Sequence, residues 1–338
     1  MARRSRVAGK PSRTAEGWQE FDRIVSEWPL VSPWTRSGDG RAVFAAQSGL
    51  LEELLAVPIR LGLPTQSGMP AKAVDVWVAH ELRRAGFLED EVWPRSTAPR
   101  VLPREVAMLR SFKGMLDISK SLFERIDAGR VGGGITGADA KILGKAYEKQ
   151  VDVVIAQWAR GPELMISTKR MDSSFGKNAL NRIEESYGDA KNLRGRHPLA
   201  ATGFLFVMRS TALEQERDTA LRLMDLLGKL SQEVDAYDAT GLVLVKWQDP
   251  KSGAAVTEEL DEGEALDVRV TIEYGDIPSA LRPERFLASM VTAVLDRTPI
   301  NLHEEARRRR GQQVPEEEGV TGAFDADAAQ HTASDDSL

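Results

Sequence analysis

Cysteine is absent from the sequence. Its absence excludes disulfide frameworks, thiol catalysis and zinc sites built from cysteine. No apolar run is long enough to cross a bilayer, and the basic residues 1–17 lack the apolar stretch of a signal peptide. We therefore expect a soluble, cytoplasmic protein with no membrane partner.

Histidine is also scarce, and the four histidines do not have the spacing of a zinc site. They are His80, His197, His303 and His331. Neither the GxSxG turn of serine hydrolases nor a dinucleotide-binding fingerprint occurs. These absences argue against several common enzyme classes.

Charge is nearly balanced outside the C-terminal tail. The formal net charge is −6, and residues 311–338 hold seven acidic residues and no lysine or arginine. The rest of the chain is close to neutral, with local basic clusters that suit an anionic partner. Bulk charge therefore neither requires nor excludes nucleic acid.

Composition and periodicity divide the 338 residues into four parts. Residues 1–15 are predicted to be a disordered basic arm, 16–130 a mostly helical region that could bind DNA, 131–305 an α/β core, and 306–338 a disordered acidic tail. Three glycines at 132–134 indicate a hinge near the second boundary.

Helices and strands are predicted to alternate in the α/β core. The expected helices cover 138–150, 178–187 and 211–237, and the expected strands cover 163–170, 200–209, 240–247 and 266–274. In the N-terminal region helices are expected at 18–28, 47–55, 71–85 and 104–123. This order predicts an α/β fold with a mixed central sheet flanked by helices.

The segment Ile166-Ser-Thr-Lys169 carries the clearest chemical signal. Ser167 and Lys169 share one face of the predicted strand, while Thr168 faces the other way. A hairpin of residues 151–157 with 163–169 would bring Asp152 opposite Thr168. The alternative is that the preceding helix continues to Trp158, and the sequence does not decide between the two.

Two glutamates are further candidates. Glu184 falls along the apolar stripe of Leu180, Ile183 and Tyr187, so its carboxylate is predicted to face the sheet. An inward carboxylate is costly unless paired or bound to a metal. The alternative is a salt bridge to Arg170 or Arg182. Glu148, on the predicted helix before the hairpin, could face the same site or remain solvated.

These residues resemble the PD-(D/E)XK nuclease superfamily, the fold of most type II restriction endonucleases. Ser167-Thr-Lys169 is similar to a Ser-X-Lys variant in which the missing acid has migrated to the next helix. The resemblance implies a restriction-endonuclease-like core in which Asp152 and Glu184 bind Mg²⁺. It also implies that Lys169 orients or activates the attacking water, with Ser167 at the position of the usual acid.

A basic segment follows the predicted helix 178–187. In a loop ending at Pro198, Lys191 would contact the DNA backbone and Arg194 or Arg196 would read bases. Arg170 and Arg182 are further candidate DNA contacts. The alternative is a local balance of charge.

The sequence thus predicts a Mg²⁺-dependent endonuclease of double-stranded DNA, of the restriction-modification or phage-defence type. The resemblance implies a homodimer, and a companion DNA methyltransferase is a possible partner. The alternative is a DNA-binding or scaffold protein on the same fold without catalysis, because Ser167 replaces an expected acid.

Overall fold

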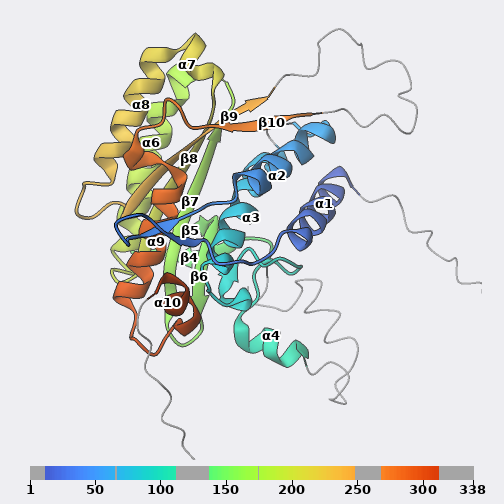
Figure 1. The fold of residues 1–338 in the computed structure, drawn as a ribbon, viewed down its shortest axis with the longest axis vertical. Helices are drawn as coiled ribbons and strands as arrows, with labels where there is room; N and C mark the ends of the chain where they lie inside the picture. Colours follow the sequence, from blue (N-terminus) through green and yellow to red (C-terminus); the bar gives the residue numbers. More distant parts are fainter. Residues whose placement is uncertain (1–11, 65–66, 112–136, 174, 248–267, 312–338) are drawn as a thin grey trace, which may run out of the picture.

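A computed structural model describes residues 12–64, 67–111, 137–173, 175–247 and 268–311. The fold is α/β, with a six-stranded mixed sheet between two layers of helices (Figure 1). The predicted fold class is confirmed at this level. Most of the predicted arm, the 132–134 hinge and the acidic tail beyond residue 311 lie outside the described residues.

The six-stranded sheet has the order β10-β9-β8-β7-β6-β3. Its strands are β3 (Val92–Trp93), β6 (Val153–Gln157), β7 (Gly161–Met171), β8 (Ala201–Arg209), β9 (Ala239–Trp247) and β10 (Val270–Glu273). β6 and β7 form an antiparallel hairpin, β7, β8 and β9 run parallel, and the outer strands β3 and β10 are antiparallel to their neighbours. Two separate ribbons pair β1 (Trp34–Arg36) with β2 (Ala42–Phe44) and β4 (Ala140–Leu143) with β5 (Glu148–Val151).

The parallel strands are joined by helices that cover one face of the sheet (Figure 1). These are α6 (Phe175–Arg194), α7 (Thr211–Gln215) and α8 (Arg217–Leu230). Phe204, Phe206 and Leu242 point into this layer. β8 is buried along almost its whole length, because helices cover both faces of the parallel strands.

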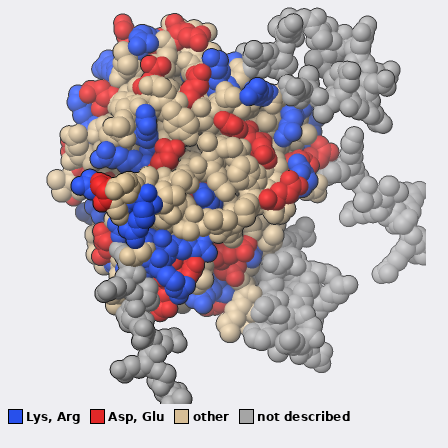
Figure 2. Space-filling view, viewed as in Figure 1, with Lys and Arg blue, Asp and Glu red and all other residues tan. Residues whose placement is uncertain are grey.

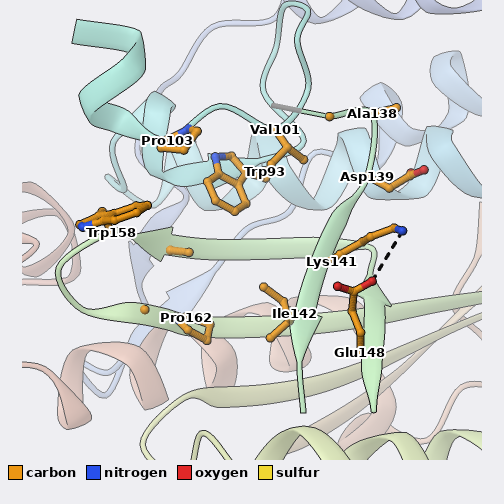
Figure 3. A pocket seen from close by; sticks show the side chains of 13 residues that line it. Trp93, Val101, Pro103, Ala138, Asp139, Lys141, Ile142, Glu148, Trp158 and Pro162 are labelled. Carbon is orange, nitrogen blue, oxygen red and sulfur yellow. Dashed lines mark ion pairs between the residues drawn. The ribbon is translucent and has the colours of Figure 1, made fainter. Parts of the chain in front are cut away.

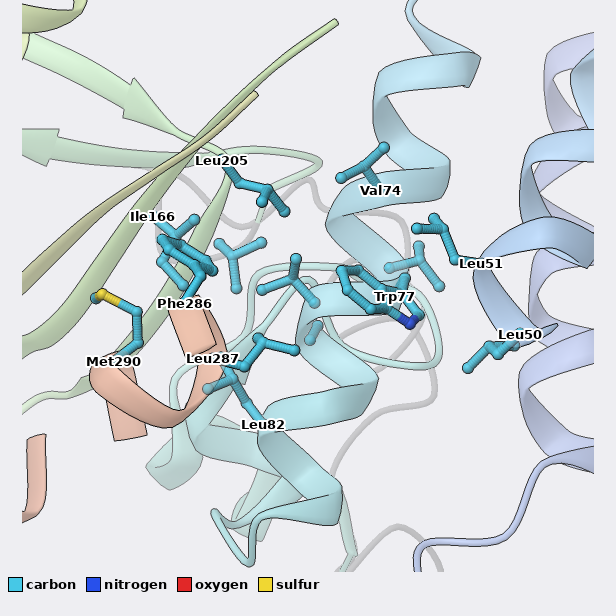
Figure 4. Close-up of a cluster of buried hydrophobic side chains, with 14 of the residues drawn as sticks. Leu50, Leu51, Val74, Trp77, Leu82, Ile166, Leu205, Phe286, Leu287 and Met290 are labelled. Carbon is cyan, nitrogen blue, oxygen red and sulfur yellow. The ribbon is translucent and has the colours of Figure 1, made fainter. Parts of the chain in front are cut away.

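The opposite face packs against α1 (Arg13–Glu27), α2 (Ser48–Arg60), α3 (Met69–Arg84) and α9 (Pro283–Arg297). Trp77 of α3 lies at the centre of this cluster, and Val74 and Leu82 extend it along the helix (Figure 4). Because α1 to α3 share a core with the sheet strands, the N-terminal helices are built into the α/β layer structure.

Glycines in the sheet make room for α9. An alanine Cβ at Gly203 would lie 2.8 Å from the Met290 sulfur and 2.9 Å from Phe286 Cζ. At Gly241 the same methyl group would lie 2.9 Å from Phe286 Cβ. The Phe286 side chain therefore packs directly against the backbone at Gly203 of β8 and Gly241 of β9.

Most predicted elements are found, several of them longer than expected. β8 and β9 match the predicted strands within one residue, while α6 and α3 extend beyond the predicted helices. α4 (Arg104–Ser111) begins at the predicted residue. α10 (Glu304–Arg310) extends past residue 305, where the core was predicted to end, and α1 starts inside the predicted arm. Two short 3-10 turns lie at Glu89–Glu91 and Ser279–Leu281.

Two helix predictions are wrong. Residues 138–150 form the β4–β5 ribbon, because Asn192 of α6 accepts hydrogen bonds from the backbone of Ala146 and Tyr147 and fixes the turn. The predicted helix 211–237 is broken at Glu216, whose backbone is not helical, and it ends at Leu230. Among the described residues, no helix combines the length and the apolar character needed to cross a membrane.

The contact between Gly203 and α9 gives a test of this packing. We expect Gly203→Ala to lower the free energy of unfolding by about 1–3 kcal/mol, because overpacking displaces the Phe286 and Met290 side chains. Denaturant unfolding measures the change. In a Phe286→Leu background, which lacks the outer ring atoms, the same substitution should cost less. Equal costs in both backgrounds would contradict this packing.

Candidate functional site

Thr168, in the middle of β7, donates hydrogen bonds to two aspartates. Its backbone N–H donates to Asp152 Oδ2 at 2.8 Å, and its hydroxyl donates to Asp75 Oδ1 at 2.6 Å. Asp75 comes from α3 and Asp152 from the bend between β5 and β6. One strand residue therefore brings together two carboxylates that are 77 positions apart in the chain.

The predicted hairpin is confirmed. Its register differs by one residue from the prediction, because Val153 pairs with Ile166 and the ladder therefore points Asp152 toward Ser167, where Thr168 was predicted; Gln157 pairs with Gly161. The question of whether Asp152 belongs to a strand or a helix is also answered, because it lies in the bend at which the chain leaves one sheet and enters another. That bend directs its carboxylate to the Thr168 amide.

Lys72 lies one turn before Asp75 on α3 and supplies a cation. Its ammonium lies 3.3 Å from Asp75 Oδ2 and 2.9 Å from Asp139 Oδ1. Burial lowers the pKa of Lys72, but the surrounding carboxylates outweigh that effect and raise it. The lysine is therefore held in its charged form.

Burial and like charge shift both aspartates. Burial, and then the negative charge of Asp152, raise the pKa of Asp75 to about 7. The Lys72 ammonium and the Thr168 hydroxyl act in the opposite direction without cancelling this effect. Asp75 is only 1% exposed, so its charged form is poorly solvated.

The pKa of Asp152 is raised as well. Burial is the largest cause, and the Thr168 hydrogen bond and nearby lysines oppose it. The opposing charges belong to Lys169, Lys72 and Lys149. Lys169 therefore acts electrostatically on Asp152, as the hairpin predicted, although no direct ion pair joins them. Ser167 is buried in the same strand.

Glu184 does not belong to this cluster, and its predicted inward orientation is wrong. Its side chain is exposed on the outer surface of α6. The buried face of the helix is made by Phe175, Ala179, Ile183, Ser186, Asp189, Ala190, Asn192 and Leu193. This face is rotated away from the stripe defined by Leu180 and Tyr187, and Glu184 lies outside it.

The inward carboxylate of α6 is Asp189. It lies 2.5 Å from the Lys149 ammonium of β5 and accepts a hydrogen bond from the Tyr147 hydroxyl at 3.1 Å. Sequence reasoning missed it because Gly188 and Ala190 beside it carry no strong apolar signal. It lies three residues after the buried Ser186 and next to the buried Ala190, which places it on the buried face.

Glu148 is solvated, which was the alternative left open for it, but its predicted helix is wrong. It lies on β5 and not on a helix, and its exposed carboxylate pairs with Lys141 at 3.6 Å. Structural ion pairs also engage most of the predicted DNA contacts. Lys191 pairs with Asp235, Arg194 with Asp238, Arg170 with Asp172 and Arg182 with Glu185.

Arg170 and Arg182, the predicted salt-bridge partners of Glu184, do not pair with it.

Lys191 and Arg194 lie in the last turn of α6 and not in a loop. Arg196 follows in the predicted loop and is exposed. Among the predicted DNA contacts, Arg196 is the one whose side chain has no ion pair with another described residue.

A cleft of about 650 Å³ lies between the β6–β7 hairpin and the β4–β5 ribbon, with Asp139 among its lining residues (Figure 3). Trp93, Pro103 and Trp158 line it on one side, and the β4–β5 ribbon lines the other. Asp139 and Trp93 also line a small hollow that contains Lys72 and Asp152. The cleft and the acidic cluster therefore adjoin one another.

Within the described part of the chain, no group of three or more histidine or acidic side chains is arranged to hold a metal ion. Asp75 and Asp152 are the two carboxylates that Thr168 brings together, and Lys169 acts electrostatically on Asp152. Comparison of the chain with protein-family models, curated proteins and solved structures gives no match.

The raised pKa of Asp75 predicts how stability depends on pH. Between pH 3.8, its ordinary pKa, and about 7, the unfolded chain loses the proton while the folded chain keeps it. Asp75 therefore reduces stability progressively as the pH rises through this range. Denaturant unfolding should show wild type losing stability relative to Asp75→Asn between pH 4 and 7. A difference that does not change with pH would refute the assignment.

Proposed function

We propose that this protein is a Mg²⁺-dependent endonuclease that hydrolyses phosphodiester bonds of double-stranded DNA. The observation that carries the proposal is the pair of buried carboxylates, Asp75 and Asp152, that Thr168 holds together through its hydroxyl and its amide. Perturbed carboxylates beside cations are common where catalytic chemistry is done. The local order of strands, an antiparallel hairpin followed by a helix and a parallel strand, also suits the resemblance to PD-(D/E)XK nucleases.

The donor set fits magnesium. Mg²⁺ prefers oxygen ligands, keeps several waters, and is commonly bound through one or two carboxylates together with substrate phosphates. Asp75 and Asp152 would hold it, so the second acid comes from the preceding helix α3 in place of Glu184. When bound, the ion would stabilise charge on the scissile phosphate and lower the pKa of an attacking water.

The remaining roles follow from position. Thr168 holds both carboxylates in one orientation through its amide and its hydroxyl. Lys169 supplies positive charge near Asp152, where it would orient the water or stabilise the phosphate. Ser167 would support the site through hydrogen bonds. Asp189 would support it by holding Lys149, whose charge acts on Asp152.

A place in restriction-modification or phage defence belongs to the same proposal. The resemblance favours a homodimer in which each subunit cuts one strand, and a companion methyltransferase would protect host DNA. Arg196 is the best-placed residue of the basic segment for DNA, because its guanidinium is exposed and carries no internal ion pair.

A second candidate function is DNA binding without cleavage. Lys72 favours it, since its ammonium already pairs with Asp75 and Asp139 where a metal ion would otherwise offset their charge. Ser167 also removes one acid from the usual set. The two functions differ in whether DNA is cut when magnesium is added.

Cleavage of plasmid DNA with purified variants tests the proposal. Wild type should cut with Mg²⁺ and not with EDTA. Asp152→Asn, Asp75→Asn and Lys169→Ala should each lower the rate about 100-fold or more, because each removes charge from the reacting centre. Circular dichroism should confirm that each variant is folded.

Glu184→Gln is the matched control, since that carboxylate is exposed and should not affect cleavage. Equal losses in the Glu184 and Asp152 variants would contradict the revised assignment. DNA binding by wild type without any cleavage in Mg²⁺ or Mn²⁺ would favour the second candidate.

A further inference from the structure

Two tryptophans line the cleft beside the acidic cluster. Trp93 of β3 and Trp158, at the turn of the β6–β7 hairpin, both border it (Figure 3). The Trp93 indole is fixed by a hydrogen bond from Nε1 to the Leu102 carbonyl at 3.2 Å. Trp93 is partly buried against the apolar cluster around Val154 and borders the cleft with the rest of its ring.

Trp158 is 82% exposed, which leaves a large apolar ring in water. Such a residue at a tight turn adds nothing to the hydrophobic core. Aromatic rings of this kind bind nucleobases by stacking, with a gain of about 1–3 kcal/mol for each base. Pro103 and Pro162 add rigid apolar surface to the same cleft.

The cleft shares lining residues with a small hollow at Asp152. Trp93 pairs with Val154, two residues from Asp152, and it also lines the hollow that contains Asp152 and Lys72. Trp158 lies six residues beyond Asp152, on the order of 20 Å along the strand. A nucleic-acid strand whose phosphate lies at Asp152 could therefore place bases against both rings.

Basic side chains lie near the cleft, each of them also ion-paired with a glutamate. Arg104 and Arg160 directly adjoin the lining residues Pro103 and Gly161, and Lys141 belongs to the lining itself. Figure 2 shows lysine and arginine side chains gathered where α10 lies, and the last turn of that helix is basic. His303, just before α10, lies 3.1 Å from Glu163 of β7 and anchors the basic helix to the hairpin end of the sheet.

We propose that this cleft binds an unpaired nucleobase of the DNA, stacked on Trp158 and Trp93, while the strand continues to the Asp75–Asp152 cluster. The inference rests on the proposed function for its choice of nucleic acid as ligand. It adds that the substrate has at least one unstacked base near the point of cleavage. Single-stranded DNA or a locally opened duplex would supply that base.

Fluorescence anisotropy with labelled (dT)20 tests the inference on the full chain, in EDTA so that no cleavage occurs. Trp158→Ala should weaken binding about 5- to 150-fold, the range that loss of one stacked base implies. Trp158→Phe should retain most of the affinity because it keeps an aromatic face. Leu199→Ala, at another exposed apolar residue, should bind like wild type.

A probe of the same length with a central abasic tract separates stacking from phosphate contacts. Trp158→Ala should bind this probe as well as wild type does. The inference is overturned if Trp158→Ala binds (dT)20 normally, if Phe and Ala are equally weak, or if the abasic probe is affected equally. It is also overturned if sedimentation shows that Trp158 instead holds a second copy of the chain.

The two proposals can fail separately. Loss of (dT)20 binding in Trp158→Ala, with no DNA cleavage by wild type, would support the base site and reject the hydrolysis. Cleavage that requires Asp152 but is insensitive to Trp158, in both binding and rate, would keep the nuclease and reject the base site.

Discussion

The paired hydrogen bonds of Thr168 are the constraint on which the site depends. They join helix α3, strand β7 and the bend before β6, three segments that no local sequence pattern connects. Two carboxylates held on one residue repel each other, and burial increases the cost of their charge. Nearby lysines offset part of the cost of burying these charges. The pKa of Asp75 is nevertheless raised, so the offset is incomplete. Such a cluster lowers the stability of the fold, which is common at functional sites.

Much of the fold could be predicted because its strands carry strong local signals. The central runs of β8 and β9, residues 203–208 and 241–245, are apolar, which is typical of parallel strands covered on both faces. The hairpin of β6 and β7 followed from the turn between two apolar segments. The ribbon of β4 and β5 could not be predicted, because Ile142, Leu143 and Ala146 also fit a helical period. Its turn is fixed by Asn192, about 46 residues later in the chain.

The site was predictable only in part, for a related reason. Asp152 and Lys169 could be linked because both belong to one hairpin. Asp75 gave no signal, since periodicity assumes that a helix has one exposed face, whereas α3 is buried almost all round. Glu184 was misplaced because large apolar residues were given more weight than the small ones that actually face the sheet. Tertiary contacts, which a single sequence does not display, decided both cases.

The coupling between the two aspartates is measured most directly by carboxyl-carbon NMR titration of Asp75 in the folded protein. Asp75 should titrate near pH 7 in wild type. In Asp152→Asn it should titrate at clearly lower pH, because the neighbouring negative charge is gone. The same midpoint in both proteins would mean that the two carboxylates do not share a site.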